Sequence, residues 1–322
     1  MVTILPVASG KGGVGKTVFT ANLGVALAKA GKTVVLMDLD LGGSNLHTVL
    51  GVRNRHAGVG NLIYKQEEGL ESLLVPTSQD RLFLIPGDAL LPGTANLPYF
   101  RKQRIIKETS ALVADFVILD LGSGTTYNTV DFFLTGSDGV IVCTPETTSI
   151  LNAYSFIKTS VYRMLYRSFP KTSPERGMVQ SFIEERIEGS DNSFDTLGQR
   201  LGEISEGARE IFQQCLQSFH PRVVLNMGRR VEDLEIGRRL RTIARRNLGI
   251  EVNFIGYLPR EELLTESIIK RQPVIELNPT GAFARSLTMI SQRIINAPRG
   301  SEPKLHEDDE DIRELARSAQ SM

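Results

Sequence analysis

The nine residues SGKGGVGKT, at positions 9–17, constrain the fold of this chain more than any other stretch. They contain the pattern G-x-x-x-x-G-K-T, which predicts a phosphate-binding loop when a strand precedes it and a helix follows. Both conditions hold, because an apolar run covers residues 2–8 and a helical pattern covers residues 16–30. The glycines let backbone N–H groups and the helix N-terminus face an anion. We therefore expect Lys16 to reach the β- and γ-phosphates and the Thr17 hydroxyl to ligate Mg²⁺.

Short apolar runs alternate with helical patterns along most of the chain, which is typical of parallel β-α-β units. The last helical pattern, residues 281–296, places Phe283, Leu287, Ile290 and Ile294 on one face. These features predict an α/β fold, with an open, doubly wound and mostly parallel sheet that has helices on both faces. The expected strands are residues 2–8, 33–37, 82–85, 116–120, 139–143, 222–225 and 252–256.

The stretch from about residue 170 to residue 219 breaks this alternation. It is polar, contains glycines and serines, and turns helical in SEGAREIFQQCLQSF without an apparent strand. Long insertions in compact domains tend to be functional, so we interpret it as a helical insertion that binds a partner rather than as a plain surface elaboration. We expect one domain over residues 1–296, followed by a flexible acidic tail at 297–322 that contains EDDED.

Composition limits the partners and the compartment. Basic and acidic residues number 37 each, so the overall charge does not indicate nucleic acid or an anionic membrane. No apolar run approaches the roughly 18 residues of a membrane span, and the first residues lack the basic region of a signal peptide. Cys143 and Cys215 lie far apart, which fits a reducing cytosol and argues against an iron–sulfur cluster held by paired cysteines. We expect a soluble, cytoplasmic protein.

These motifs resemble the MinD/ParA family of ATPases, whose deviant Walker loop has the form KGGVGKT. The similarity continues through NLGVALAKAGKTVVLMDLDLGGSNLHTVLG, FVILDLGSG, GVIVCTPET, VVLNMGRR and GYLPRE, and so covers most of the chain outside the insertion and the tail. It implies a P-loop fold of the SIMIBI type, ATP and Mg²⁺ as cofactors, slow ATP hydrolysis and an ATP-dependent homodimer.

The resemblance also explains why the loop holds a second lysine, Lys11, where the general pattern accepts almost any residue. In the family this lysine crosses the dimer interface and contacts the phosphates bound by the other subunit. A cation at that place offsets the repulsion between two facing triphosphates. Lys11, Lys16 and Asp40 are the expected catalytic residues, and Asp40 is expected to orient the attacking water.

Further site residues follow from the same resemblance. Asp38 is expected near the metal, and Asp120 at the Walker B position is expected to hold Mg²⁺ through a coordinated water. The expected metal residues are Thr17, Asp38 and Asp120. Asn226 would read the adenine edge, and the turn after the next strand would line the other side of the base. The expected nucleotide contacts are Gly10, Lys11, Gly12, Gly13, Val14, Gly15, Lys16, Thr17, Val18, Asn226, Pro259, Arg260 and Glu261.

Two residues depart from the family pattern. His47 stands where relatives usually carry aspartate, and Asn152 stands where division-site MinD proteins use an acid to bind their partner. Partners of the Min type are therefore not expected, and the cargo and the effector stay unidentified. The insertion is the candidate surface for an effector protein.

Three interpretations of the function stay open. The stretch DLDLGGSNLHTVLG is more similar to FlhG-type members than to partition proteins, which favours polar localisation or control of flagellar number. An ATP-dependent ligase of the dethiobiotin synthetase kind is the alternative from another class, although it would not need Lys11. A ParA-like partition ATPase would bind DNA through the seven arginines between Arg229 and Arg246, where a solvated helix face is the favoured interpretation.

The surface that would anchor the protein at the inner membrane or the cell pole is also open. The acidic tail differs from the basic amphipathic anchors of MinD and FlhG, because a negative leaflet would repel it. Residues 156–169, FIKTSVYRMLYRSF, interleave basic and aromatic side chains. A helix packed on the sheet is the favoured interpretation of this segment over a peripheral membrane contact.

Overall fold

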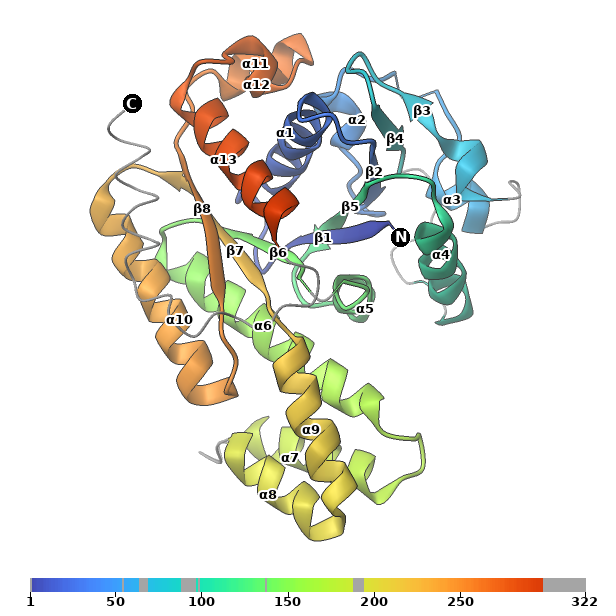
Figure 1. Cartoon of the computed structure of the whole chain (residues 1–322), viewed down its shortest axis with the longest axis vertical. Coiled ribbons are helices and arrows are strands. Elements are labelled where there is room, and N and C mark those ends of the chain that lie inside the picture. The colour runs from blue at the N-terminus through green and yellow to red at the C-terminus, as the bar shows by residue number, and fades with distance from the viewer. Residues whose placement is uncertain are drawn as a thin grey trace.

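The computed structural model describes residues 2–53, 55–63, 69–87, 97, 99–136, 138–187 and 194–297. Within these residues the chain forms an eight-stranded sheet in the order β3-β4-β2-β5-β1-β6-β7-β8, with helices on both faces (Figure 1). The described strand pairs are parallel except for β3 with β4. The strands are β1 (Thr3–Ser9), β2 (Val34–Leu39), β3 (Val75–Pro76), β4 (Leu82–Ile85), β5 (Phe116–Ser123), β6 (Val140–Cys143), β7 (Arg222–Gly228) and β8 (Asn253–Pro259). The predicted α/β, doubly wound and mostly parallel sheet is confirmed.

The strand bounds differ from the predicted ones mainly at the carboxyl ends. The predicted strands ended at residues 37 and 120, whereas backbone pairing between β2 and β5 continues to Leu39 and Leu121, and Asp38 lies opposite Asp120 in register. The edge strand β3 was not predicted, because two residues carry no readable alternation.

The helices pack in two layers because side chains alternate between the faces of each buried strand. In β2, Val35 and Met37 join the core on one face, whereas Val34 and Leu36 join the core on the other. One face carries α1 (Lys16–Lys29), α2 (Leu46–Val49), α12 (Val274–Leu277) and α13 (Ala282–Asn296). The opposite face carries α3 (Val59–Ile63), α4 (Tyr99–Ala111), α5 (Tyr127–Phe133), α6 (Thr147–Ser168) and α10 (Leu234–Leu248). Three short helices, η1 (Leu70–Leu73), η2 (Val231–Asp233) and α11 (Leu264–Lys270), complete the described elements outside the insertion.

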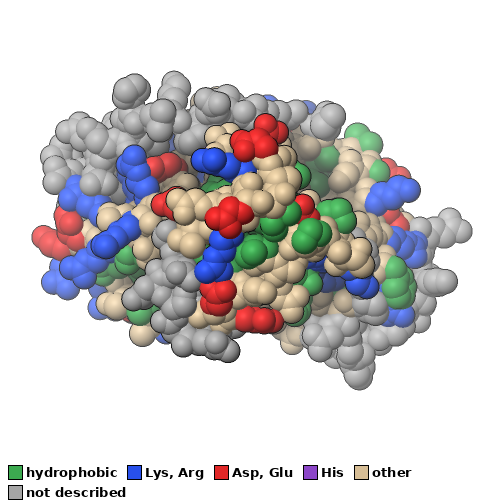
Figure 2. All heavy atoms as spheres, turned by 90° about the horizontal axis from the view of Figure 1, so that it is seen from below, with side chains coloured by type: hydrophobic (Ala, Val, Ile, Leu, Met, Phe, Trp, Pro, Cys, Tyr) green, Lys and Arg blue, Asp and Glu red, His purple; other side chains and the backbone are tan. Residues whose placement is uncertain are grey.

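The predicted insertion is helical. It contains α7 (Pro174–Ile187), α8 (Phe194–Ile204) and α9 (Glu206–Ser218), which extend from the sheet at the far end of α6 (Figure 1). Its own small core is aromatic: the rings of Phe182 and Phe212 lie 6.1 and 6.5 Å from that of Phe194, and Tyr162 of α6 lies 5.1 Å from Phe194. Figure 2 looks onto this end of the molecule and shows hydrophobic side chains gathered near its middle, with acidic side chains beside them.

The segment 156–169 follows the favoured interpretation of a helix packed on the sheet. It forms the second half of α6, and Phe156, Ile157, Val161 and Leu165 are buried in the core. The predicted tail from residue 298 onward lies outside the described residues. Among the helices that the structure describes, none combines the length and the apolar character that crossing a bilayer requires.

Candidate nucleotide-binding site

The phosphate loop runs from the end of β1 to the start of α1, and glycine geometry shapes it. Gly13 and Gly15 have φ values of 81° and 82°, in the left-handed region that side chains with a Cβ rarely adopt. Gly10 serves a different purpose, since a Cβ at this position would lie 2.1 Å from the backbone oxygen of Asn152. The first glycine therefore permits α6 to pack directly against the loop. Lys11 is exposed on the loop.

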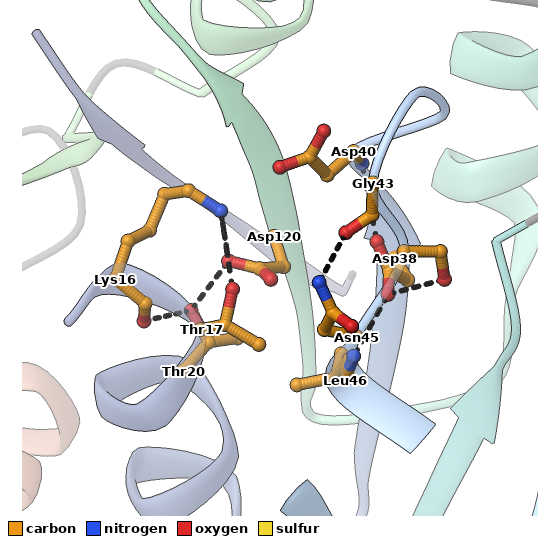
Figure 3. Close-up of polar contacts among 10 residues, drawn as sticks. Lys16, Thr17, Thr20, Asp38, Asp40, Gly43, Asn45, Leu46 and Asp120 are labelled. Atoms are coloured by element: carbon orange, nitrogen blue, oxygen red, sulfur yellow. Dashed lines mark hydrogen bonds and ion pairs between the residues drawn. The ribbon is translucent and has the colours of Figure 1, made fainter. Parts of the chain in front are cut away.

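Lys16 points inward and pairs with Asp120. Its Nζ lies 2.7 Å from Asp120 Oδ1, and both side chains are buried. Thr20, one helical turn after Lys16, donates a hydrogen bond of 3.1 Å to the same carboxylate oxygen (Figure 3). The sequence reasoning missed Thr20, although its spacing of four residues from Lys16 places both side chains on one face of α1.

Asp38 organises the loop between β2 and α2. Its Oδ1 accepts a hydrogen bond of 3.1 Å from the backbone N–H of Asp40. Its Oδ2 accepts one of 2.7 Å from the Ser44 hydroxyl and one of 3.0 Å from the backbone N–H of Leu46 (Figure 3). Burial and the neighbouring Asp120 carboxylate raise the pKa of Asp38 to about 6. The expected metal residue Asp38 therefore already has both oxygens engaged with the protein, and Ser44 is a site residue that sequence reasoning missed.

Asp40 lies at the mouth of the site. A Cβ on Gly122 would come within 3.5 Å of Asp40 Oδ1, so this carboxylate faces the loop that follows Asp120. Burial raises the pKa of Asp40, and Lys16 opposes that effect. In Figure 3 the Asp40 side chain points toward the space above Lys16 and Asp120. Such a place suits a group that would accept a hydrogen bond from a water molecule.

The predicted base-side residues come together at the carboxyl ends of β7 and β8. Asn226 is buried, and its Nδ2 donates a hydrogen bond of 2.8 Å to the carbonyl oxygen of Val14. The backbone N–H of Arg260 donates to the Gly228 carbonyl at 2.9 Å. Glu261 Oε1 accepts a hydrogen bond of 3.0 Å from the Leu263 N–H. Asn226 thus ties β7 to the phosphate loop, a role that the sequence reasoning did not foresee.

The two departures from the family pattern have local environments of their own. The His47 ring lies 3.1 Å from the Thr48 hydroxyl, and burial together with Arg271 lowers its pKa. Asn152 donates a hydrogen bond of 2.8 Å to the Thr148 carbonyl along α6.

The residues present fit a nucleotide with Mg²⁺. Asp120 Oδ2 is buried and meets no hydrogen-bonding partner among the described residues, so it offers a lone pair to a cation or to a water that a cation holds. The Thr17 hydroxyl lies 3.5 Å from Lys16 Nζ, close to the same place. When bound, Mg²⁺ would neutralise phosphate charge. The ion would be held by Thr17 and Asp120, and the phosphates by Lys16. The backbone from Gly12 to Gly15 would wrap around the phosphates.

The fold and this site define a P-loop nucleotide-binding domain. Residues 5–275 match the family model described as "CobQ/CobB/MinD/ParA nucleotide binding domain", and the chain belongs to this family. Its MinD/ParA members are nucleotide-binding ATPases. The predicted membership is therefore confirmed.

Three relatives illustrate the similarity. The septum site-determining protein MinD of Synechocystis is 33% identical over 158 residues, which are 48% of this chain and 57% of that protein. The antiactivator FleN of Pseudomonas aeruginosa is 24% identical over 307 residues, 95% of this chain and 90% of that protein. The MinD of Pyrococcus horikoshii, solved with Mg-ADP, is 17% identical, with a TM-score of 0.62 over 92% of this chain and 97% of that one. The chain spans about half the length of the MinD relatives that it matches in sequence.

Proposed function

We propose that the chain is an ATP-dependent dimerising switch with slow ATP hydrolysis, and that it regulates or positions a cellular machine, with control of flagellar number as the favoured task. The single observation that carries this proposal is the difference in burial between the two lysines of the phosphate loop. Lys16 is buried against Asp120, whereas Lys11 is exposed on the same loop. An exposed cation beside bound phosphates is available to a second subunit, which supports the dimer.

Hydrolysis within the dimer follows from the remaining residues. Asp40 would orient water near the γ-phosphate, and the Asp38 network would keep Asp40 in place through its backbone N–H. Thr17 and Asp120 would hold Mg²⁺. Lys16 and Asp120 neutralise each other, since a buried unpaired charge is costly.

The flagellar assignment is supported by the match to the flagellum site-determining protein YlxH of Helicobacter pylori, which covers 91% of this chain, and by the extent of the FleN match. That match covers 95% of this chain, including the insertion, whereas the Synechocystis MinD match covers 48%. The name antiactivator says that this relative opposes an activator. The insertion α7–α9, with its mixed hydrophobic and acidic end (Figure 2), is the surface that we assign to an effector or cargo protein.

Two measurements test the switch and its task. Size-exclusion chromatography with light scattering should give a dimer with ATP and Mg²⁺ and a monomer with ADP, and phosphate release should be slow and need no second substrate. If ATP turnover required a carboxylic acid, the chain would instead be a ligase of the dethiobiotin synthetase kind, and the switch proposal would be wrong. Deleting the gene in its own organism should change the number of flagella per cell, and an unchanged number would overturn the flagellar task alone.

The DNA-partition alternative depends on α10 and its flanks. Three of its arginines interact within the chain: Arg238 pairs with Glu235 at 2.7 Å, Arg245 pairs with Glu251 at 3.1 Å, and Arg241 Nε donates to the Val252 carbonyl at 3.2 Å. We therefore favour the interpretation that these arginines form a solvated helix face over the interpretation that they bind DNA. Salt-dependent binding of a DNA duplex by the wild type with ATP and Mg²⁺, weakened in an Arg245→Ala, Arg246→Ala variant, would reverse this preference.

A further inference from the structure

A cavity of about 630 Å³ lies between the core domain and the insertion. Its lining includes Tyr127 at the start of α5, Lys158, Tyr162, Arg163 and Tyr166 on α6, and Gln180 on α7. The volume falls within the range of about 300–1,000 Å³ that small-molecule sites occupy. The cavity has a wall on α7, so it exists because the insertion is there. Its lining also includes basic and aromatic residues of segment 156–169, none of which belongs to the nucleotide site.

The walls of the cavity are aromatic and already carry cations. The Arg163 guanidinium lies 4.9 Å from the centre of the Tyr127 ring, and Lys158 Nζ lies 5.8 Å from that of Tyr162. Arg176 lies 4.1 Å from the centre of the Tyr166 ring. Tyr127 is 71% exposed, so its ring is accessible to a ligand. Such rings and guanidinium planes stack on planar ligands.

Positive charge is in excess around this cavity. The buried carboxylate of Asp131 lies between three cations, with Lys102 Nζ at 2.5 Å, Arg163 Nε at 2.7 Å and Arg167 Nη1 at 3.2 Å. Among the residues that line the cavity, two cations, Lys158 and Arg163, stand against one carboxylate, Glu184. The lining therefore carries a net positive charge, which attracts an anion.

The insertion side supplies polar groups that can contact the edge of a ring. Gln180 Nε2 donates a hydrogen bond of 3.1 Å to Glu184 Oε1, and both side chains line the cavity from α7. The Glu184 carboxylate can accept hydrogen bonds from N–H groups, and the Gln180 amide can donate one to a carbonyl oxygen. Guanine presents both kinds of group along one edge, so it serves as a suitable ring for a probe.

We propose that this cavity binds a small aromatic phosphate of the nucleotide class, at a second site separate from the phosphate loop. The ring lies between the tyrosines, and the phosphate lies against Lys158 and Arg163. Tyr127 begins α5, directly after the loop that follows Asp120, so a ligand here contacts both the insertion and the helix next to the nucleotide site.

Isothermal titration at low salt with guanosine monophosphate, guanosine and ribose 5-phosphate tests the proposal. We expect the monophosphate to bind and the other two probes, which lack the phosphate or the ring, to bind at least about tenfold more weakly. Binding should persist in Lys16→Ala, whose phosphate loop lacks its central cation, while ATP binding measured in parallel is lost. The second site is overturned if the wild type does not bind the monophosphate at millimolar concentration. It is also overturned if Lys16→Ala loses monophosphate binding along with ATP binding.

Two cavity variants and one matched control locate the binding. Lys158→Glu should weaken monophosphate binding about tenfold or more, and Tyr166→Leu should weaken it by removing the aromatic face while keeping apolar bulk. Lys171→Glu makes the same charge change at an exposed lysine that is not in the cavity lining and should leave binding unchanged. Equal binding by Lys158→Glu and Lys171→Glu overturns the proposal, and this pair decides the matter even if Lys16→Ala fails to fold.

Discussion

The Lys16 ammonium group lies 2.7 Å from the Asp120 carboxylate, although the two residues are 104 positions apart in the chain. Without Asp120, Lys16 would be a buried charge with no partner, and the same holds for Asp120 without Lys16. Thr20 stabilises the same oxygen of Asp120 from the next turn of α1.

Replacing each of the two lysines of the phosphate loop should impair a different property of the protein. We expect Lys16→Ala to weaken ATP binding at least about 100-fold, because it removes the charge-assisted contacts to two phosphates. Lys11→Ala should keep most of the binding but lose ATP-dependent dimerisation and turnover. Calorimetry and light scattering measure these properties, and Lys29→Ala, at an exposed lysine outside the loop, is the control. A Lys11→Ala protein that dimerises and hydrolyses ATP normally would remove the trans role of Lys11.

Replacing Asp40 should trap the ATP-bound dimer. None of the loop groups that would contact phosphate depends on Asp40, so Asp40→Ala should bind ATP normally while turnover falls by about 10²–10⁴-fold. Size-exclusion chromatography followed by analysis of the bound nucleotide measures this, with the exposed Asp80→Ala as the matched control. A monomeric, nucleotide-free Asp40→Ala protein would show that this aspartate is structural or holds the metal.

The Asp131 cluster should contribute strongly to stability. Asp131→Asn leaves the buried Lys102 without its counter-charge, so we expect the free energy of unfolding to fall by about 3–5 kcal/mol. The control is Glu266→Gln, which breaks an exposed pair with Lys270 and should cost less than about 1 kcal/mol. Urea denaturation of both variants measures the difference, and equal losses would contradict this account.

The Asp131 contribution should also depend on pH. Burial alone would raise the pKa of Asp131, but hydrogen bonds from Arg163 and Lys102 outweigh burial and lower it. Because the folded pKa lies below the unfolded one, the stabilisation is present above the unfolded value of about 3.9 and is lost as the pH falls through the folded value. The stability gap between wild type and Asp131→Asn should therefore narrow in acid below about pH 4. A gap that widens there would mean that the carboxylate is not the group responsible.

The two cysteines should differ in their reaction with iodoacetamide. Burial raises the pKa of Cys143 to about 12, so its reactive thiolate is scarce as well as inaccessible. Cys215 is only partly buried, although burial raises its pKa too. At pH 8 we expect slow single labelling of the folded protein, lost in Cys215→Ser, and double labelling in denaturant. Intact-mass measurement follows both reactions, and rapid double labelling without denaturant would contradict the buried position of Cys143.

The sequence determined those parts of the molecule that depend on neighbouring residues. The phosphate loop could be predicted because Gly13 and Gly15 must adopt positive φ close to Lys16, and all of these positions lie within a few residues. The strands could be predicted because both of their faces are buried, which requires continuous apolar runs. The helical character of the insertion could be predicted from α9 but not from its aromatic core, which Phe182, Phe194 and Phe212 form across three helices.

Only the tertiary structure decided which distant side chains meet. The bond from Asn226 to the Val14 carbonyl joins residues 212 positions apart, and it exists because the doubly wound order brings the end of β7 near the phosphate loop. The hydrogen bonds that Asp38 accepts from Ser44, Leu46 and the backbone of Asp40 also follow from the fold of the loop after β2. The cavity between α5, α6 and α7 depends on how the insertion packs against α6. Such contacts arise from strand order and helix packing, which local residue patterns do not encode.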